Sequence, residues 1–366
     1  MRIGANEAPE ARCAIEPNRM SRPSLRRTRE DPAVRPQTAD ALAAALRGGS
    51  RRALARAVTL VESSRPDHRE QAERLIETIL PWTGGATRVG ISGPPGAGKS
   101  TFIERFGLDG IARGKRIAVL AVDPGSKRGG GAILGDKTRM TELARAPGAF
   151  IRPSSAGLQM GGVARRTREA ILVCEAAGFD TVLVETVGAG QAETTVAEMV
   201  DMFLLTLPPA AGDELQGLKR GIIELADLIL VNKADGTLLD HARRAAAEYA
   251  NAMRLIPPAL PEWQVAVRAV SALTGEGVDT VWDDVARFRA ALEASGAWTR
   301  RRAEQARAAL WAEIGDGLIE RFRAAPAIAA KLAAVEREVT AGVRTPAAAA
   351  RRLLAAFLGK DGGGGG

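Results

Sequence analysis

A phosphate-binding loop is the clearest chemical feature of the sequence. The segment GPPGAGKS matches the pattern G-x-x-x-x-G-K-[ST] and lies between a strand-like apolar run and a helical stretch. Glycines let the backbone curl so that successive N–H groups face phosphate oxygens, and the following helix presents its positive end to the same anion. We expect the lysine to reach the β and γ phosphates and the serine hydroxyl to bind Mg²⁺. The expected nucleotide-binding residues here are Gly93, Pro94, Pro95, Gly96, Ala97, Gly98, Lys99, Ser100 and Thr101.

A second motif, Asn232-Lys233-Ala234-Asp235, indicates guanine as the base. The Asp235 carboxylate can accept hydrogen bonds from guanine N1–H and the exocyclic amine, a pair of donors that adenine lacks. A site built on such bonds can reject the wrong ligand by up to about 10⁵-fold, so Asp235 predicts selection of GTP over ATP. Asn232 is expected to tie this loop to the phosphate loop, and the Lys233 stem to lie over the base. A further base-contacting loop is expected at Ser271, Ala272 and Leu273.

Two carboxylates that end strand-like runs, Asp123 and Glu185, are candidates for metal binding and for orienting water. Mg²⁺ prefers few carboxylates together with phosphate oxygens and water. One carboxylate is therefore expected to act on the metal, directly or through water, while the other could hold the attacking water. Gly188 is expected to donate its N–H to the γ-phosphate. Small GTPases mostly carry Gln after this glycine, whereas Ala189 stands here, which predicts slow intrinsic turnover that a partner stimulates.

Two segments are candidate switches, residues 125–139, which are rich in glycine, and residues 208–220. Asp136 of the first is expected to swing toward the metal, and Lys219 of the second toward the γ-phosphate, when the nucleotide or a partner changes. The candidate catalytic residues are thus Lys99, Asp123, Glu185, Gly188 and Lys219. The candidate metal ligands are Ser100, Asp123, Asp136 and Glu185.

An α/β scaffold is needed to bring these motifs together. Between about 84 and 292, short apolar runs alternate with longer helical stretches, which is typical of βαβ units and a doubly wound, mostly parallel sheet. Ligands of open α/β sheets bind outside the carboxyl ends of the strands. The polar residues expected around that crevice are Ser92, Asp123, Glu185, Asn232 and Ser271. The expected strands are Arg88–Ser92, Ile117–Asp123, Thr181–Glu185, Met202–Leu207, Leu228–Asn232 and Val265–Ser271.

Helical segments flank the α/β region, because three-to-four spacing of apolar residues covers 37–83 and 293–358. In the second segment Pro326 interrupts the pattern, and Thr345 followed by Pro346 predicts an N-cap and a first-turn proline. Three helices attached to a complete α/β domain have little core of their own. We therefore expect this C-terminal arm to pair two subunits.

The first 36 residues lack apolar periodicity, so they are expected to be disordered, and residues 359–366 are expected to form a flexible glycine tail. Acidic residues within the first 36 argue against a transit peptide, and no secretory signal is recognisable. No run of about 18 apolar residues occurs, so membrane anchoring by a helix is not expected. These features favour a cytoplasmic location.

Composition narrows the possible partners. The 366 residues include 51 basic and 43 acidic side chains, a net charge of +8, but no aromatic and basic residues interleave as a platform for nucleic acid requires. We expect no nucleic-acid partner. Two cysteines and two histidines cannot form a disulfide framework or an endogenous zinc or nickel cage.

Taken together, the motifs resemble the MeaB/ArgK/MMAA family of P-loop GTPases, which are chaperones of adenosylcobalamin-dependent acyl-CoA mutases. The resemblance covers roughly residues 40–358. It rests on the phosphate and guanine loops and on further segments. These are Val122-Asp123-Pro124, Gly130 to Asp136, Ile151 to Ser154, Gly161 to Ala164, Glu185 to Gln191 and Gly212 to Arg220.

The resemblance implies a helical N-terminal extension, a GTPase domain and a C-terminal arm that pairs two subunits. It also implies that GTP binding and hydrolysis gate the delivery of adenosylcobalamin to the mutase and support release of damaged cofactor. No cobalamin motif is present, so the mutase is expected to hold that cofactor. The family usually reads Asp-Pro-Ser-Ser-Pro-Phe-Thr-Gly-Gly in the first switch, whereas Gly125, Lys127, Arg128 and Gly129 stand here.

Three other functions are alternatives to this one. A nickel-insertion GTPase of the same branch would share the nucleotide site. It would be expected to carry a cysteine pair or a histidine-rich tract, and the sequence has neither. A signal-recognition-type GTPase would need a methionine-rich domain, and the chain has seven methionines. A kinase acting on a transport protein would need ATP, against which Asp235 argues.

Overall fold

The structure is a computed structural model that describes residues 38–123, 140–155, 160–186, 192–209 and 220–359. Within these ranges seven parallel strands form one sheet in the order β3-β2-β4-β1-β5-β6-β7. The sequence prediction of a parallel, doubly wound α/β fold is therefore confirmed. The strands are β1 (Thr87–Ser92), β2 (Ile117–Asp123), β3 (Ala149–Ser155), β4 (Thr181–Thr186), β5 (Met202–Leu207), β6 (Leu228–Val231) and β7 (Ala266–Ala269).

Strand β3 was not among the expected strands. It pairs with β2 along its whole length, from Ile117 opposite Ala149 to Asp123 opposite Ser155, and it forms one edge of the sheet. Pro153 lies within it, and proline is tolerated in an edge strand because one side of that strand has no ladder to complete. Only the first part of β3 is apolar, so its sequence did not resemble the continuous apolar runs from which the other strands were predicted. Strand β7 is also shorter than the predicted run 265–271.

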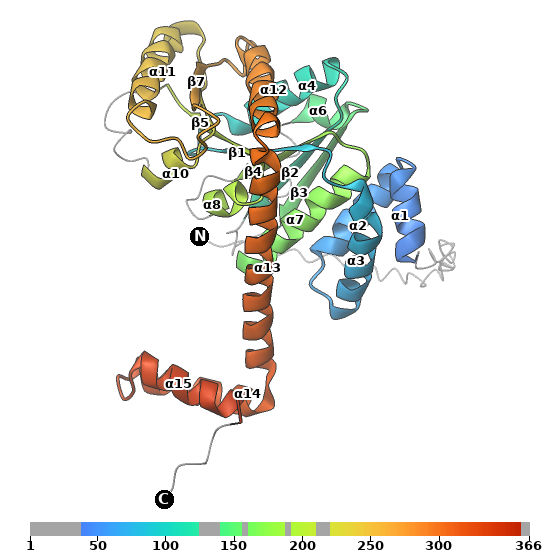
Figure 1. Ribbon diagram of the computed structural model, residues 1–366, viewed down its shortest axis with the longest axis vertical. Coiled ribbons are helices and arrows are strands. Elements are labelled where there is room, and N and C mark those ends of the chain that lie inside the picture. Colours follow the sequence, from blue (N-terminus) through green and yellow to red (C-terminus); the bar gives the residue numbers. More distant parts are fainter. Residues whose placement is uncertain (1–37, 124–139, 156–159, 187–191, 210–219, 360–366) are drawn as a thin grey trace, which may run out of the picture. The chain divides into compact units, whose positions relative to one another are not determined.

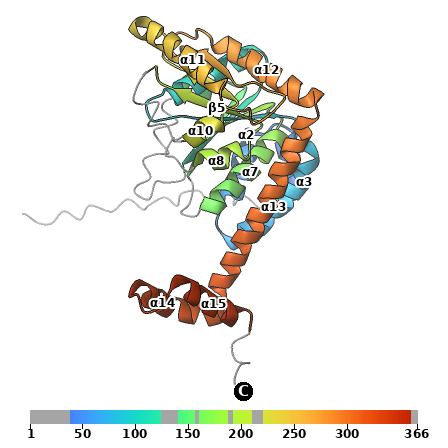
Figure 2. The same cartoon turned by 60° about the vertical axis from the view of Figure 1, so that its left-hand side comes forward.

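Helices cover both faces of the sheet, as Figures 1 and 2 show. On one face, α4 and α12 pack on Val89, Ile91 and Leu204. On the other face, α7 and α8 pack on alternate residues such as Leu120 and Val184. The helices of this region are α4 (Lys99–Ala112), α6 (Thr141–Arg145), α7 (Met160–Ala176), α8 (Ala192–Ala197), α10 (Arg220–Glu224), α11 (Leu239–Met253) and α12 (Val278–Ala294), with a 3₁₀ turn η2 (Gly236–Leu238).

Helices precede and follow the sheet as predicted. The leading ones are α1 (Ala39–Arg47), α2 (Arg51–Glu62) and α3 (Pro66–Ile79), with the turn η1 (Leu80–Trp82), and they share their core with α7. The following ones are α13 (Ala297–Ala324), α14 (Pro326–Thr340) and α15 (Pro346–Phe357), of which α14 and α15 form a small core of their own. The Thr345 hydroxyl accepts a hydrogen bond from Ala348 N–H, so this residue caps α15 as expected.

Buried ion pairs fix the start of α13 to the end of the sheet where the strands begin, which is opposite the phosphate loop. Arg302 donates to both carboxylate oxygens of Asp201 at 2.7 Å and to the carbonyl of Ala86 at 2.6 Å. Arg301 pairs with Asp227, which precedes β6, at 3.1 Å. Burial raises the pKa of Asp227, although the neighbouring Arg301 opposes this shift. The strands β1, β5 and β6 are therefore anchored to α13 at the ends away from the phosphate loop.

The structure does not describe residues 1–37 or 360–366, so the expected disorder at the two ends lies outside the described residues. Among the helices that are described, none is long and apolar enough to cross a membrane.

Candidate nucleotide-binding site

The phosphate loop joins β1 to α4 in a conformation that requires glycine. Gly93, Gly96 and Gly98 have φ values of 146°, 81° and 85°, which side-chain-bearing residues rarely adopt. Space is limiting as well, since a Cβ on Gly93 would lie 1.9 Å from the carbonyl oxygen of Thr206 in β5. A Cβ on Gly98 would lie 2.5 Å from the side-chain nitrogen of Asn232. The loop is thus held closely between two neighbouring strand ends.

The first residues of α4 place a cation and free backbone donors beside this loop. Gly98 occupies the N-cap position without a side-chain cap, so the first N–H groups of the helix remain available to an anion. Lys99 is buried, and its Nζ donates to the carbonyl oxygens of Gly93 and Pro94 at 2.8 and 3.1 Å. The ammonium group therefore lies inside the curl of the loop, where a bound phosphate would meet it.

A hydroxyl and a carboxylate meet beside the loop. Ser100 Oγ donates to Glu185 Oε1 at 2.8 Å, and Glu185 is buried at the end of β4. The next residue, Thr186, donates to Ser92 Oγ at 2.8 Å and so joins β4 to the end of β1. The sequence analysis assigned no role to Thr186. Its position as a polar residue at the end of β4, directly after the candidate carboxylate, was the signal that could have shown one.

The oxygen atoms of Ser100 and Glu185 fit Mg²⁺, which takes hard oxygen ligands and keeps few carboxylates when phosphate oxygens complete its shell. In the described residues no three His, Cys, Asp or Glu side chains form a metal-binding group of their own.

Asn232 connects the two sequence motifs, as the sequence predicted. Its side-chain amide donates to the carbonyl oxygen of Ala97 at 2.9 Å, and its Oδ1 accepts from the N–H of Ala272 at 3.0 Å. The residue is buried at the end of β6. One side chain thus fixes the phosphate loop and the loop after β7 at a set distance from each other.

The loop after β6 also places Asp235 against the loop after β7. Ser271 Oγ donates to Asp235 Oδ2 at 2.5 Å and accepts from Thr274 N–H at 3.1 Å. Lys233 is exposed and has a φ of 63°, the only non-glycine residue with a positive φ in the described part of the chain. Such a conformation is uncommon for a residue other than glycine. Leu273 is 77% exposed, so its side chain is not part of the core.

Part of the expected site lies outside the described residues. Asp136, Gly188 and Lys219 fall there, as do the first switch segment and residues 210–219 of the second. Asp123 ends β2, with its backbone opposite Ser155, and nothing is described of its side chain. The structure therefore brings Lys99, Ser100 and Glu185 together on the phosphate side of the site. It brings Asn232, Asp235, Ser271 and Ala272 together on the base side.

These features define the class of protein. A parallel sheet with a phosphate loop between β1 and α4, and with an N-K-x-D segment directly after β6, is the arrangement of a P-loop GTPase.

Comparison with known proteins defines the class further. Residues 54–327 match the family described as Methylmalonyl Co-A mutase-associated GTPase MeaB. The chain belongs to this family, as the sequence motifs indicated, and it is a GTPase.

Named relatives agree with this assignment. The chain is 54% identical to a putative GTPase of Caulobacter vibrioides over 87% of its own length and 97% of the relative's. It is 47% identical to the mouse protein named methylmalonic aciduria type A homolog, mitochondrial, over 87% of this chain and 79% of that one. A solved structure described as LAO/AO transport system kinase has a TM-score of 0.70 and 37% identity, covering 86% of this chain and 96% of the other.

Proposed function

We propose that this GTPase gates the loading of adenosylcobalamin into an acyl-CoA mutase of the methylmalonyl-CoA mutase type and protects the loaded enzyme. The observation that carries the proposal is the match of residues 54–327 to a family defined by its association with that mutase. The mouse relative, named for methylmalonic aciduria, supports the same system. The mutase, and not this chain, holds the cobalamin.

The residues beside the phosphate loop act on the triphosphate. Lys99 binds the β and γ phosphates, and the N–H groups at the start of α4 bind the same oxygens. The Ser100 hydroxyl would hold Mg²⁺ together with Asp136 and with one of the two carboxylates Glu185 and Asp123, directly or through water, and the ion would neutralise charge on the phosphates. The other of these two carboxylates orients the attacking water.

Two further residues sense or complete hydrolysis. Gly188 donates its N–H to the γ-phosphate, and Lys219 approaches the same group. Thr101, at the start of α4, binds the nucleotide. Ala189 leaves no glutamine directly after the glycine, so intrinsic turnover is slow and contact with the mutase accelerates it.

The loops after β6 and β7 read the base. Asp235 accepts the two guanine donors, and the Ser271 hydroxyl, which binds the same carboxylate, holds it in place. The Lys233 stem covers the face of the base, and the backbone of Ala272 and Leu273 closes the pocket. Asn232 transmits any movement of the base loop to the phosphate loop through Ala97.

The protein works as a homodimer. Along α13, large apolar side chains are exposed in the single chain, among them Leu310, Trp311 and Leu318 at 58%, 65% and 56%. A monomer rarely exposes so many large apolar groups on one helix, and a second copy would cover them.

The proposal is tested by reconstitution with the acyl-CoA mutase of the same organism. The purified chain is loaded with GDP or with a non-hydrolysable GTP analogue and mixed with mutase, and both complex formation and the rate of adenosylcobalamin loading are measured. We expect a complex and a loading rate that depends on which nucleotide is bound. Lys99→Ala should abolish the nucleotide dependence. A loading rate unaffected by the protein, with no complex, would overturn the proposal and leave the GTPase assignment intact.

A further inference from the structure

The last two residues of β4 hold the two ends of the phosphate loop. Glu185 Oε1 accepts a hydrogen bond from the hydroxyl of Ser100, which follows the loop, at 2.8 Å. Thr186 donates to the hydroxyl of Ser92, which precedes the loop, also at 2.8 Å. Successive side chains of a strand point to opposite faces of its sheet, so these two bonds lie on opposite faces. The end of β4 therefore fixes the phosphate loop both where it begins and where it ends.

The bond between Thr186 and Ser92 begins where the backbone pairing of β4 with β1 stops. That pairing ends with Ile91 opposite Glu185. On its other side β4 stays paired for one residue more, with Thr186 opposite Val122 of β2. The side-chain bond thus takes the place of the backbone pairing on the β1 side. It keeps β4 attached to β1 as far as the last residue of both strands.

This hydroxyl pair is buried in apolar surroundings. Thr186 and Ser92 are both 0% exposed. Their face of the sheet carries Val122 and Val184 and is covered by Val196 of α8. Water does not compete for a hydrogen bond in such a place, and removal of one hydroxyl leaves the other without its partner. The bond therefore holds the two strand ends at a fixed distance from each other.

The position of Glu185 depends on this attachment. Its backbone is paired with Ile91, and the residue after it is bonded to Ser92, so loss of that bond frees the end of β4 on the β1 side. A misplacement of about 1 Å at a group that acts on the reacting atoms can lower a rate about 10²-fold. Lys99 and Asn232 are bonded to the phosphate loop itself, so nucleotide binding does not depend on the same attachment.

We propose that Thr186 is a positioning residue for GTP hydrolysis. Through its bond to Ser92 it sets the place of the Glu185 carboxylate relative to Ser100 and to the phosphates that bind beside it. Its hydroxyl lies on the face of the sheet away from α4, so it acts through its neighbour and not on the nucleotide. The inference rests on the role proposed above for Glu185 in the reaction.

The first test compares two substitutions of Thr186 in the full chain, with steady-state GTP turnover and GDP affinity as readouts. Thr186→Val keeps the shape of the side chain and removes the hydroxyl. We expect its kcat to fall about tenfold, while KM for GTP and the affinity for GDP change less than about threefold. Thr186→Ser restores the hydroxyl and should recover most of the lost turnover. Wild-type kcat in Thr186→Val, or a Thr186→Ser variant that is equally slow, would overturn the proposal.

Two further variants separate positioning from general stability. Ser92→Ala removes the same hydrogen bond from the other strand and should reproduce the fall in kcat. Thr181→Val is the matched control, because Thr181 lies at the opposite end of β4, is 1% exposed, and donates its hydroxyl to Asp180 at 3.1 Å. It should lower the melting temperature but leave turnover unchanged. Normal turnover in Ser92→Ala, or equal losses of turnover in Thr181→Val and Thr186→Val, would contradict a positioning role.

A double-mutant cycle tests whether Thr186 acts through Glu185. Once Glu185→Gln has removed the carboxylate, its exact position no longer matters. Adding Thr186→Val should then slow turnover by less than about twofold more. A further tenfold loss would show that Thr186 acts independently, and would overturn the inference. Wild-type turnover by Glu185→Gln alone would refute the role of Glu185 and this inference with it. A slow Glu185→Gln beside a fully active Thr186→Val would refute the inference alone.

Discussion

Ser100 Oγ donates a 2.8 Å hydrogen bond to Glu185 Oε1, so the first turn of α4 is joined directly to the end of β4. The two side chains are 85 positions apart in sequence. Ser100 follows β1 through the phosphate loop, and β1 pairs with β4, which carries Glu185. A ligand that engages Ser100 must therefore act on Glu185 as well.

Substitution of this carboxylate should separate binding from hydrolysis. Glu185→Gln keeps the shape of the side chain but removes the charge that holds Mg²⁺ or orients water. We expect turnover of GTP to fall by roughly 10²-fold while GDP affinity changes little. Glu248→Gln, at an exposed position of α11, is the matched control. Wild-type turnover by Glu185→Gln would exclude a direct role in the reaction.

The ion pair between Arg302 and Asp201 should contribute strongly to the free energy of unfolding. Arg302→Met leaves the Asp201 carboxylate, only 2% exposed, without its main partner. Breaking a buried pair in this way costs about 3–5 kcal/mol of the free energy of unfolding. Arg113→Met, which breaks an exposed pair with Asp109, should cost less than about 1 kcal/mol. Urea denaturation measures both, and equal costs would show that the buried pair has no special weight.

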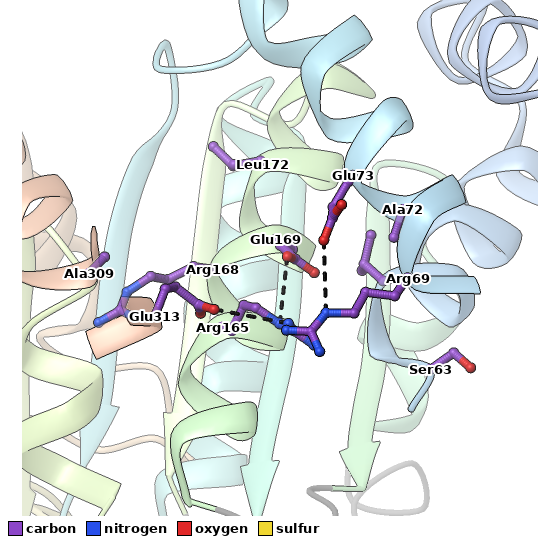
Figure 3. A pocket seen from close by; sticks show the side chains of 11 residues that line it. Ser63, Arg69, Ala72, Glu73, Arg165, Arg168, Glu169, Leu172, Ala309 and Glu313 are labelled. Atoms are coloured by element: carbon purple, nitrogen blue, oxygen red, sulfur yellow. Dashed lines mark ion pairs between the residues drawn. The ribbon is translucent and has the colours of Figure 1, made fainter. Parts of the chain in front are cut away.

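The pKa of Glu169, which lies on α7 (Figure 3), predicts a pH dependence of stability. Burial raises this pKa to about 7 in the folded chain, against an ordinary value of 4.5, so the folded state binds this proton more tightly. The stabilisation is complete below about pH 4.5 and is lost as pH rises through 7, by up to about 3 kcal/mol. Glu169→Gln should remove this loss, whereas the exposed Glu77→Gln should not. Parallel unfolding curves for wild type and Glu169→Gln from pH 5 to 8 would contradict it.

The apolar face of α13 predicts the oligomeric state. Light scattering should give a wild-type mass of about twice the 38.5 kDa of one chain. Leu318→Asp places a charge in the proposed contact and should give monomers, because an unpaired buried charge is costly. Leu255→Asp, at a position 86% exposed and outside α13, should remain dimeric. A monomeric wild-type protein at micromolar concentration would disprove the pairing.

Residues whose role depends on local backbone geometry could be predicted from the sequence. The phosphate loop needs glycine at positions 93 and 98, because a side chain there would collide with neighbouring atoms. Both glycines belong to the sequence motif, so this requirement can be recognised from the sequence. Asn232 was expected to tie the two loops together and does so, since its position directly after a buried strand fixes where it lies. The central strands could be predicted as well, because each is a continuous apolar run within one short stretch of sequence.

Features that depend on distant partners could not be predicted. Strand β3 contains Pro153 and ends in polar residues, and its pairing with β2 becomes clear only when the sheet is assembled. The packing of α3 and α13 against α7 around Arg165 is another such feature, because spacing along one helix does not show which other helices cover it (Figure 3). The Arg302–Asp201 pair joins residues 101 positions apart, for which no local pattern exists.

The choice of base tests the central claim most directly. Turnover and binding are measured with GTP, ATP and xanthosine triphosphate for the wild type and for Asp235→Asn. Xanthine carries a carbonyl where guanine carries an amine, so an amide at position 235 complements it as the carboxylate complements guanine. We expect the wild type to use GTP at least about 10³-fold better than ATP, and we expect Asp235→Asn to prefer xanthosine triphosphate. Equal use of GTP and ATP by the wild type would contradict it.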